Sequence, residues 1–145
     1  LTREAIALYL SKLSDRGVLI LHLSNRNLAL VSEAARIAHA LNVPYLYRVS
    51  DRFEQPLVSY YGGLAASVMI LTRSPEVMGR LALNPDWRII EPPPGRVWTD
   101  DYINIPRALW EGLSGVETCR IYTYLEQCEQ AASNGDARPN AQQSP

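Results

Sequence analysis

A strand that ends in polar residues offers the clearest chemistry in this sequence. Residues 18–23 are almost continuously apolar except for His22, and the chain then continues with Ser24, Asn25 and Arg26. Ligands bind open α/β sheets at the carboxyl ends of the strands. An imidazole, a hydroxyl, an amide and a guanidinium at this point therefore predict a substrate-contacting edge.

Each of these residues also has a purely structural interpretation. His22 either contacts a ligand and titrates near neutral pH, or forms a hydrogen bond within the sheet and takes no part in chemistry. Ser24 and Asn25 either line a substrate entrance or cap the turn that leads into the next helix. Arg26 either contacts a substrate or is a solvated surface charge.

Two further pairs of residues are candidates for the same site. Asp100 and Asp101 are adjacent carboxylates, and paired carboxylates hold cations or divide acid and base roles between them. Adjacent side chains usually point apart, however, and aspartate suits a helix N-terminus, so a structural role is the favoured interpretation. Tyr60 and Tyr61 precede a Gly-Gly pair in an expected loop, where they predict an aromatic wall for a ligand.

The elements that must position these groups alternate between helices and strands. A helix starts at Thr2, and Gly17 is expected to supply the left-handed residue after it. The continuous apolar run over 18–23 predicts a strand covered on both faces. The remaining elements are expected as a helix from Asn27 to Asn42, a strand over 45–49, a crossing loop over 50–63, a strand over 66–72, a helix begun by Ser74 and Pro75, and a helix begun by Asn104.

This alternation predicts an α/β fold with three layers, a sheet between two layers of helices. Three strands are few for such a sheet, so we expect half of a larger domain, or an open sheet edge covered by another chain. We place the partial domain at residues 1–113 and an additional helix at 114–132. The polar residues 133–145 predict a disordered tail.

Composition excludes several classes of function. Of the 145 residues, 47% are hydrophobic and 20% are charged, as in globular domains. The formal net charge of -1 gives no basic field for nucleic acid, and no apolar run approaches the roughly 20 residues of a membrane span. We therefore expect a cytoplasmic segment without membrane contact, although a complete parent protein can carry a membrane region elsewhere.

The two cysteines suggest no metal site. Cys119 and Cys128 stand without a CxxC pair and without a nearby histidine. In a cytosolic protein, the simplest interpretation is that both are reduced thiols.

Three segments of the chain together resemble a known family. They are the polar strand end His-Leu-Ser-Asn-Arg, the opening Leu-Thr-Arg-Glu-Ala and the downstream Trp-Thr-Asp-Asp-Tyr-Ile-Asn. Over residues 1–110 the chain resembles the carboxyl-terminal half of spermidine-synthase-like transferases, which have the class I S-adenosylmethionine methyltransferase fold. The resemblance implies that 18–23, 45–49 and 66–72 are strands five, six and seven of a Rossmann-like sheet. It also implies that strand seven runs antiparallel between the other two.

The resemblance implies transfer of an aminopropyl or methyl group from an S-adenosylmethionine-type donor. The family's glycine-rich loop, ribose-binding acid and catalytic acidic motif have no counterpart, and the chain contains no Gly-x-Gly. We therefore expect a fragment that is inactive alone and binds neither S-adenosylmethionine nor its decarboxylated form strongly, with no catalytic or cofactor-binding residue assigned. The expected partner is the N-terminal half of the domain, or a second copy through an exposed sheet edge. The alternative is a non-catalytic protein-interaction or homo-oligomerising module.

Overall fold

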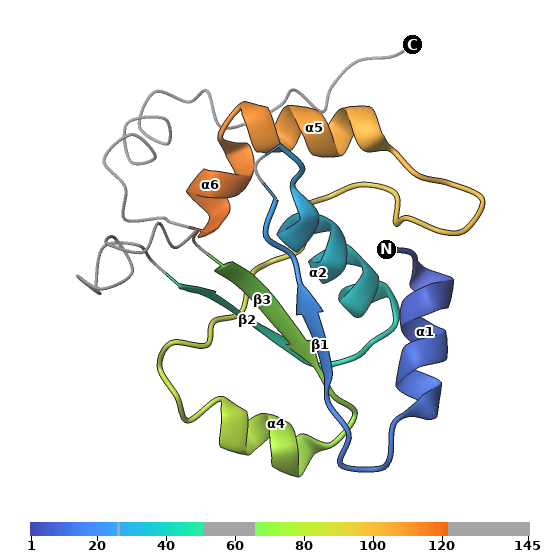
Figure 1. The fold of residues 1–145 in the computed structure, drawn as a ribbon, viewed down its shortest axis with the longest axis vertical. Coiled ribbons are helices and arrows are strands. Elements are labelled where there is room, and N and C mark those ends of the chain that lie inside the picture. The colour runs from blue at the N-terminus through green and yellow to red at the C-terminus, as the bar shows by residue number, and fades with distance from the viewer. Residues whose placement is uncertain (26, 51–65, 122–145) are drawn as a thin grey trace.

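The protein is an α/β chain in which a three-stranded sheet packs against helices (Figure 1). The computed structural model describes residues 1–25, 27–50 and 66–121. The elements in chain order are α1 (Arg3–Lys12), β1 (Leu19–His22), α2 (Leu30–Ala40), β2 (Tyr45–Ser50), β3 (Ala66–Leu71), α4 (Pro75–Leu81), α5 (Ile105–Leu113) and α6 (Val116–Ile121).

Three helices begin where their capping residues predict. The side chains of Thr2, Ser74 and Asn104 accept hydrogen bonds from the backbone N–H three residues later, at 3.4, 3.3 and 2.9 Å. Pro75 then occupies the first turn of α4, where no intrahelical N–H is needed. Local sequence alone sets these three starts.

Two predicted helix boundaries are wrong. Helix α1 ends at Lys12, and Gly17 is not among the glycines with positive φ. Its N–H instead closes a separate turn by donating to the Ser14 carbonyl at 2.9 Å. Helix α2 begins at Leu30 and not after Asn27, because the preceding turn is held by another residue, Asn25.

The sheet has the order β1-β3-β2, and β3 runs antiparallel to both neighbours. Strands β1 and β2 therefore run in the same direction without pairing to each other. The register places Leu71 of β3 opposite Leu19 on one side and Tyr45 on the other. This is the order and direction that the family resemblance implies for its last three strands.

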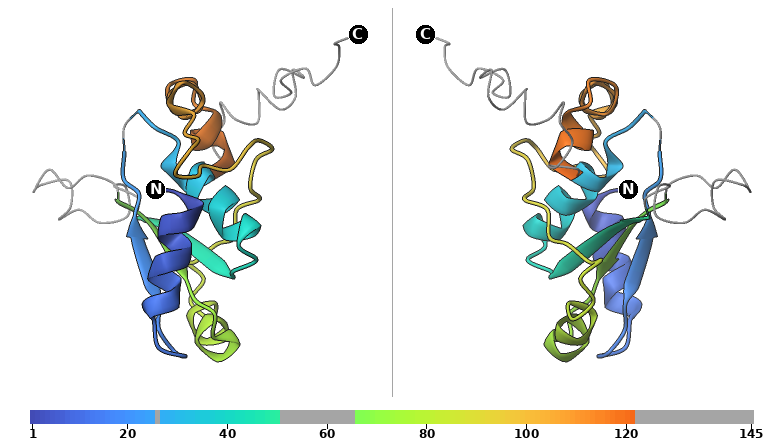
Figure 2. Two further views of the ribbon diagram at one scale, coloured as in Figure 1. Left: turned by 90° about the vertical axis from the view of Figure 1, so that its right-hand side faces the viewer. Right: turned by 90° about the vertical axis from the view of Figure 1, so that its left-hand side faces the viewer.

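One face of the sheet carries the hydrophobic core. Met69 and Leu71 of β3 and Tyr47 of β2 are buried there against Ile6 and Leu10 of α1. Helix α2 adds further buried apolar residues to the same core, namely Val31, Ala34, Ala35, Ile37 and Ala38. In Figure 2, β1 lies along one side of the molecule, and α2 lies inward of it.

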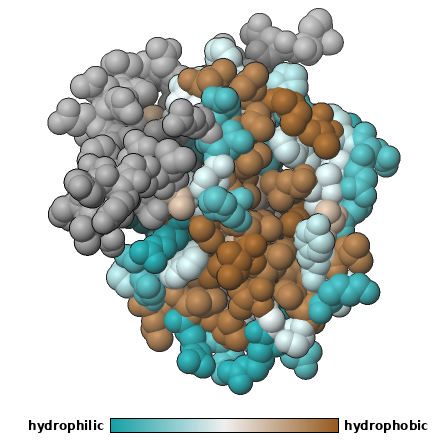
Figure 3. Space-filling view, viewed as in Figure 1, coloured by the Kyte–Doolittle hydropathy of each residue, from teal (hydrophilic) through white to brown (hydrophobic). Residues whose placement is uncertain are grey.

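The opposite face is not covered as the sequence predicts. Ile20 of β1 is 65% exposed, although Ile70 and Leu46, its neighbours across the sheet, are buried. Apolar residues gather on this face in Figure 3. The prediction that β1 is covered on both faces is therefore wrong. A second helical layer over Ile20, which would make three layers, is not found among the described residues.

The two edges of the sheet differ. Beyond β2, Tyr47 and Arg88 exchange two backbone hydrogen bonds of 2.8 and 2.9 Å, and the Tyr45 hydroxyl donates to the Ile90 carbonyl at 2.6 Å. Burial raises the pKa of both tyrosines, and the nearby Glu91 carboxylate raises that of Tyr45 further. Beyond β1, no described residue adds a backbone partner.

The C-terminal helix expected over 114–132 is described as α6 up to Ile121. Its expected continuation to 132 and the expected tail over 133–145 lie outside the described residues. Cys119 is disulfide-bonded, so the prediction of a reduced thiol is wrong for this residue, because spacing alone does not reveal pairing in the folded chain. Within the described ranges, every helix is too short or too polar to cross a bilayer.

Candidate functional site

The end of β1 forms a hydrogen-bonded pair of polar side chains. Ser24 Oγ lies 2.8 Å from His22 Nε2 and accepts a 2.9 Å hydrogen bond from the Ser67 backbone N–H. The Leu23 N–H donates in turn to the Ser67 carbonyl at 2.8 Å. The start of β3 therefore positions the Ser24 hydroxyl, which in turn contacts the imidazole. We call His22 and Ser24 the rim pair.

The hydrogen bond between Ser24 and His22 can form with either a neutral or a protonated imidazole. A serine hydroxyl has one proton to donate and two lone pairs to accept with. With a neutral imidazole protonated on Nδ1, Ser24 donates to Nε2; with a protonated imidazole, Nε2 donates and Ser24 accepts from both the ring and Ser67. Both side chains are exposed, so a ligand has access to them.

Asn25 caps the loop that leads into α2. Its Oδ1 accepts hydrogen bonds from the N–H groups of Asn27 and Leu28, both at 2.9 Å. This is the structural alternative considered for Asn25, since its oxygen is already used by the backbone. Arg26, Tyr60 and Tyr61, the other candidates of this region, lie outside the described residues.

Asp100 joins a distant loop to the start of α1. Its Oδ1 accepts from Thr2 Oγ1 at 2.7 Å, and its N–H donates to Glu4 Oε2 at 3.1 Å. The backbone N–H of Glu4 itself, then the Arg3 side chain and the Asp100 N–H, lower the pKa of the Glu4 carboxyl. Asp101 is exposed, and its side chain makes no hydrogen bond with a described residue.

The predicted candidates thus fall into separate groups. The hydrogen bonds of Asp100 go to Thr2 and Glu4 at the start of α1, whereas that of His22 goes to Ser24, so no hydrogen bond links the two. The adjacent carboxylates do not form a shared pair either, since Asp100 is engaged and Asp101 is not. Within the described ranges, no three His, Cys, Asp or Glu side chains are grouped to hold a metal ion.

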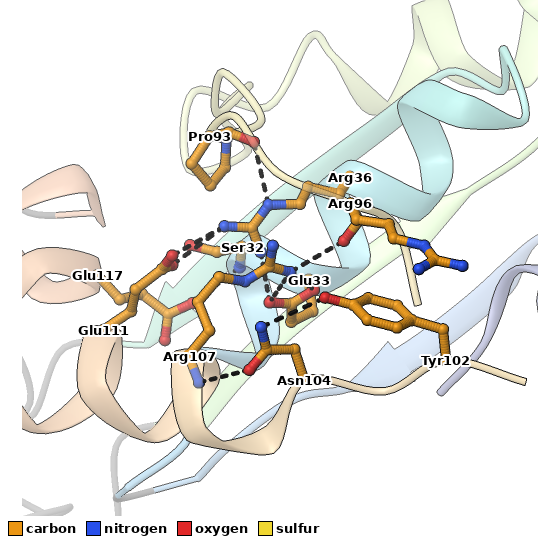
Figure 4. Close-up of polar contacts among 10 residues, drawn as sticks. All are labelled: Ser32, Glu33, Arg36, Pro93, Arg96, Tyr102, Asn104, Arg107, Glu111 and Glu117. Atoms are coloured by element: carbon orange, nitrogen blue, oxygen red, sulfur yellow. Dashed lines mark hydrogen bonds and ion pairs between the residues drawn. The ribbon is translucent and has the colours of Figure 1, made fainter. Parts of the chain in front are cut away.

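A second polar cluster, which the sequence analysis missed, lies between α2 and α5 (Figure 4). Glu33 accepts hydrogen bonds from Arg36 and, at 2.9 and 3.0 Å, from Arg107 Nη2. Arg36 Nη2 reaches both carboxylate oxygens of Glu111 at 3.0 and 3.2 Å. We call these four residues the buried ion cluster, because the Glu33 and Arg36 side chains are only 0% and 2% exposed.

The loop before α5 completes the buried ion cluster. The Pro93 carbonyl accepts from Arg36 Nε at 3.0 Å, and the Arg96 carbonyl accepts from Arg107 Nη2 at 3.1 Å. Gly95 lies between them with φ of 140°, and a Cβ there would clash with the Arg107 guanidinium. The cluster therefore fixes both the loop and α5 against α2, which is a structural function.

Helices α5 and α6 supply hydrogen-bond acceptors for backbone N–H groups at the start of α2. The N-cap residue Ala29 has no side chain to cap the helix. The Ser32 N–H donates instead to the Glu117 carboxylate of α6 at 2.8 Å, and the Ala29 N–H donates to the Ala108 carbonyl at 2.9 Å. A carboxylate is favourable at a helix N-terminus, where N–H groups are unpaired.

Helix α5 presents its polar side to the protein and its apolar side to solvent. Arg107 and Glu111 point into the buried ion cluster, whereas Leu109, Trp110 and Leu113 are 38%, 70% and 65% exposed. Trp110 is therefore not part of the core, whereas Trp98 is buried at 4% exposure.

One sequence signal was available for the buried ion cluster. Glu33 and Arg36 are spaced i, i+3 among alanines and an isoleucine, inside the helix expected after Asn27. A charged pair among small apolar residues is buried only if a second element also packs on the charged side of the helix. Here α5 packs on that side of α2.

The comparisons with known proteins give no relative. No protein-family model, no curated protein and no solved structure matches the chain.

Proposed function

We propose that this chain is the C-terminal part of a spermidine-synthase-like transferase, with β1, β2 and β3 as its fifth, sixth and seventh strands. The observation that carries the proposal is the position of β3, the last of the three strands, which lies antiparallel between two strands that share one direction. The placement of α1 and α2 on one face of the sheet adds support, because consecutive strands of a Rossmann-like sheet are connected by helices that cover a face.

In this proposal the rim pair belongs to the acceptor side of the site. The carboxyl end of β1 is the ligand edge of the sheet, and His22 and Ser24 are exposed there. The donor of the aminopropyl or methyl group, an S-adenosylmethionine-type molecule, would be held by the glycine-rich and acidic motifs that this sequence does not contain. His22 and Ser24 would orient the acceptor and exchange a proton with it, which are the contributions that positioned side chains make to group transfer.

The first test is donor binding by the 145-residue chain. Calorimetric titration with S-adenosylmethionine and with its decarboxylated form is expected to give no binding in the micromolar range. Micromolar binding would show a donor site within these residues and would contradict the proposal. The coding sequence upstream gives an independent test: a continuous frame with a Gly-x-Gly loop and an acidic motif is expected, and a genuine start codon near Leu1 argues against it.

The second test uses a protein that carries both parts. His22→Ala is expected to reduce turnover while the melting temperature stays within a few degrees of the parent. His39→Ala is the matched control, since His39 is also exposed but lies at the last turn of α2. If the rate is preserved in both variants, His22 has no role in acceptor placement.

A second candidate function is a non-catalytic interaction module. The observation that favours it is the edge of β1, which pairs with no backbone group of the described residues. An unpaired strand edge is a template for pairing with another chain. If the folded chain does not bind the donor but does bind a defined partner at this edge, the interaction module is supported over the transferase.

A further inference from the structure

We propose that the edge of β1 that faces away from β3, where no described residue adds a backbone partner, pairs with the same edge of a second copy. The two strands run antiparallel across a two-fold axis, so that the two sheets become one. This inference rests on the second candidate function and names its partner. It concerns the 145-residue chain, because an edge strand accepts only one new neighbour. A strand four supplied by a donor-binding half would occupy the same place.

The backbone of β1 has its outward groups at two residues. In an antiparallel ladder, alternate residues direct both N–H and C=O toward the same neighbour. Leu23 donates to Ser67 of β3 at 2.8 Å, so Leu19 and Leu21 also face β3. Ile20 and His22 therefore direct their N–H and C=O groups away from β3, toward this edge.

Several registers satisfy both the hydrogen bonds and the two faces of the sheet, and we propose the one that pairs Ile20 with Ile20 because it covers this exposed side chain. Residues directly opposite each other in an antiparallel pair lie on the same face. Pairing Ile20 with Ile20 of the second copy places Leu19 opposite Leu21 on the core face and Val18 opposite His22 on the open face. The exposed Ile20 side chain, 65% accessible in the single chain, is then covered by its own counterpart.

The charge of the strand favours a second copy as the partner. Residues 17–25 contain no Asp, Glu, Lys or Arg, and the whole chain has a formal net charge of -1. Identical strands with charged side chains would place like charges opposite each other, which is destabilising. Strand β1 also lacks the lysine, proline or bulge by which edge strands are protected from pairing.

The other edge of the sheet decides between a dimer and a fibre. Strand β2 is already paired at Tyr47 by two backbone hydrogen bonds with Arg88. A head-to-tail contact of β1 along the whole of β2, which would generate an open filament, would have to break these two bonds. The symmetric contact of β1 with β1 leaves them in place, and such an isologous interface closes as a dimer.

Charge exchange at Ile20 tests the proposed register. Sedimentation equilibrium over a range of protein concentrations is expected to show a monomer–dimer equilibrium for the parent chain. Ile20→Lys and Ile20→Glu, studied separately, are each expected to weaken the dimer by at least about tenfold in Kd, because like charges then meet at the two-fold axis. An equimolar mixture of the two variants is expected to restore the dimer.

The controls distinguish this edge from other apolar surfaces. Ile89→Lys changes another exposed isoleucine, 74% accessible and outside β1, and is expected to leave the dimer intact. Circular dichroism confirms that each variant is folded. A parent chain that remains monomeric at millimolar concentration would overturn the proposal. A dimer that survives both Ile20 substitutions, or that Trp110→Lys dissociates instead, would also overturn it. None of these outcomes depends on donor binding, so the transferase proposal is tested separately.

Discussion

The rim pair and the buried ion cluster lie on either side of the loop that joins β1 to α2, and they differ in exposure to water. His22 and Ser24 form their hydrogen bond at the surface, within reach of solvent. Glu33 and Arg36 form theirs where almost no side-chain surface is exposed. The polar side chains on the two sides of this loop are therefore expected to contribute very differently to the stability of the fold.

The difference follows from what replaces a lost contact. A surface hydrogen bond that is removed is replaced by hydrogen bonds to water, so its net contribution to stability is small. A buried charge that loses its partner keeps the full penalty of desolvation. The buried ion cluster is therefore expected to control stability, whereas the rim pair is expected to contribute little to it.

Removing one charge from the buried ion cluster is expected to have the largest effect. Glu33→Gln leaves Arg36 and Arg107 without their shared carboxylate, and we expect the free energy of unfolding to fall by about 3–5 kcal/mol. Urea denaturation followed by circular dichroism measures this change. Glu76→Gln is the control, because Glu76 pairs with Arg16 at 63% exposure, and such surface pairs contribute only about 0–1 kcal/mol. Equal effects in the two variants would remove the distinction between the clusters.

A substitution at the junction of the two regions tests whether they are packed together. A Cβ at Gly112 of α5 would clash with the carbonyl oxygen of Asn27, in the loop after the rim pair. Gly112→Ala is expected to lower the free energy of unfolding by about 1–3 kcal/mol, as overpacking does. Gly79→Ala in α4 meets no atom within 4 Å, and there the better helix former is expected to stabilise by about 0.5–1 kcal/mol. A stabilising Gly112→Ala would contradict the packing of α5 on this loop.

Breaking the rim pair is expected to have a smaller effect. Ser24→Ala leaves the Ser67 N–H without its acceptor, and because the site is exposed we expect a loss of about 1 kcal/mol or less. Amide hydrogen exchange gives the more specific measurement, with faster exchange at Ser67. The Leu23 amide, which donates to the Ser67 carbonyl, is the internal control and is expected to exchange at an unchanged rate. Unchanged exchange at Ser67 would mean that Ser24 does not hold this amide.

The smallest effect is expected from an exposed carboxylate that titrates. The pKa of Glu4 is lower in the folded protein than in the unfolded chain. Its contribution to stability is therefore present above the unfolded pKa of about 4.3 and is lost as the pH falls through the folded pKa. Glu4→Gln is expected to reduce the loss of stability between about pH 5 and pH 3, measured by urea denaturation at each pH. Parallel stability curves for the parent and the variant would show that Glu4 makes no such contribution.

Features fixed by neighbouring residues were predictable from the sequence. Thr2, Ser74 and Asn104 cap their helices as expected, because a capping side chain acts within one turn. The order of the strands was expected from the family resemblance and not from periodicity. The start of α2 was mispredicted because Asn25 competes with Asn27 for the turn, and both residues suit it equally well in the sequence.

Features that depend on distant segments were not predictable. The exposure of Ile20 depends on what covers β1, and its apolar neighbours in the sequence suggested cover on both faces. The buried ion cluster requires α5 to dock on α2, which brings Glu111 to Arg36 across 75 positions of chain. Of the candidate site, His22 and Ser24 were brought together, whereas Asp100 was found in the contact with α1.

Helix α5 directs charged side chains inward and apolar side chains outward, and its two sides are therefore under different evolutionary constraints. Arg107 and Glu111 must match Glu33 and Arg36, so in related sequences these positions should change together or not at all. The outward residues Leu109, Trp110 and Leu113 need not match any partner in the core, so substitutions at these positions are expected to leave the fold intact. Conservation of these outward residues among related sequences would therefore indicate selection for a contact outside the core. Conservation on the inner side of the same helix would indicate selection for folding.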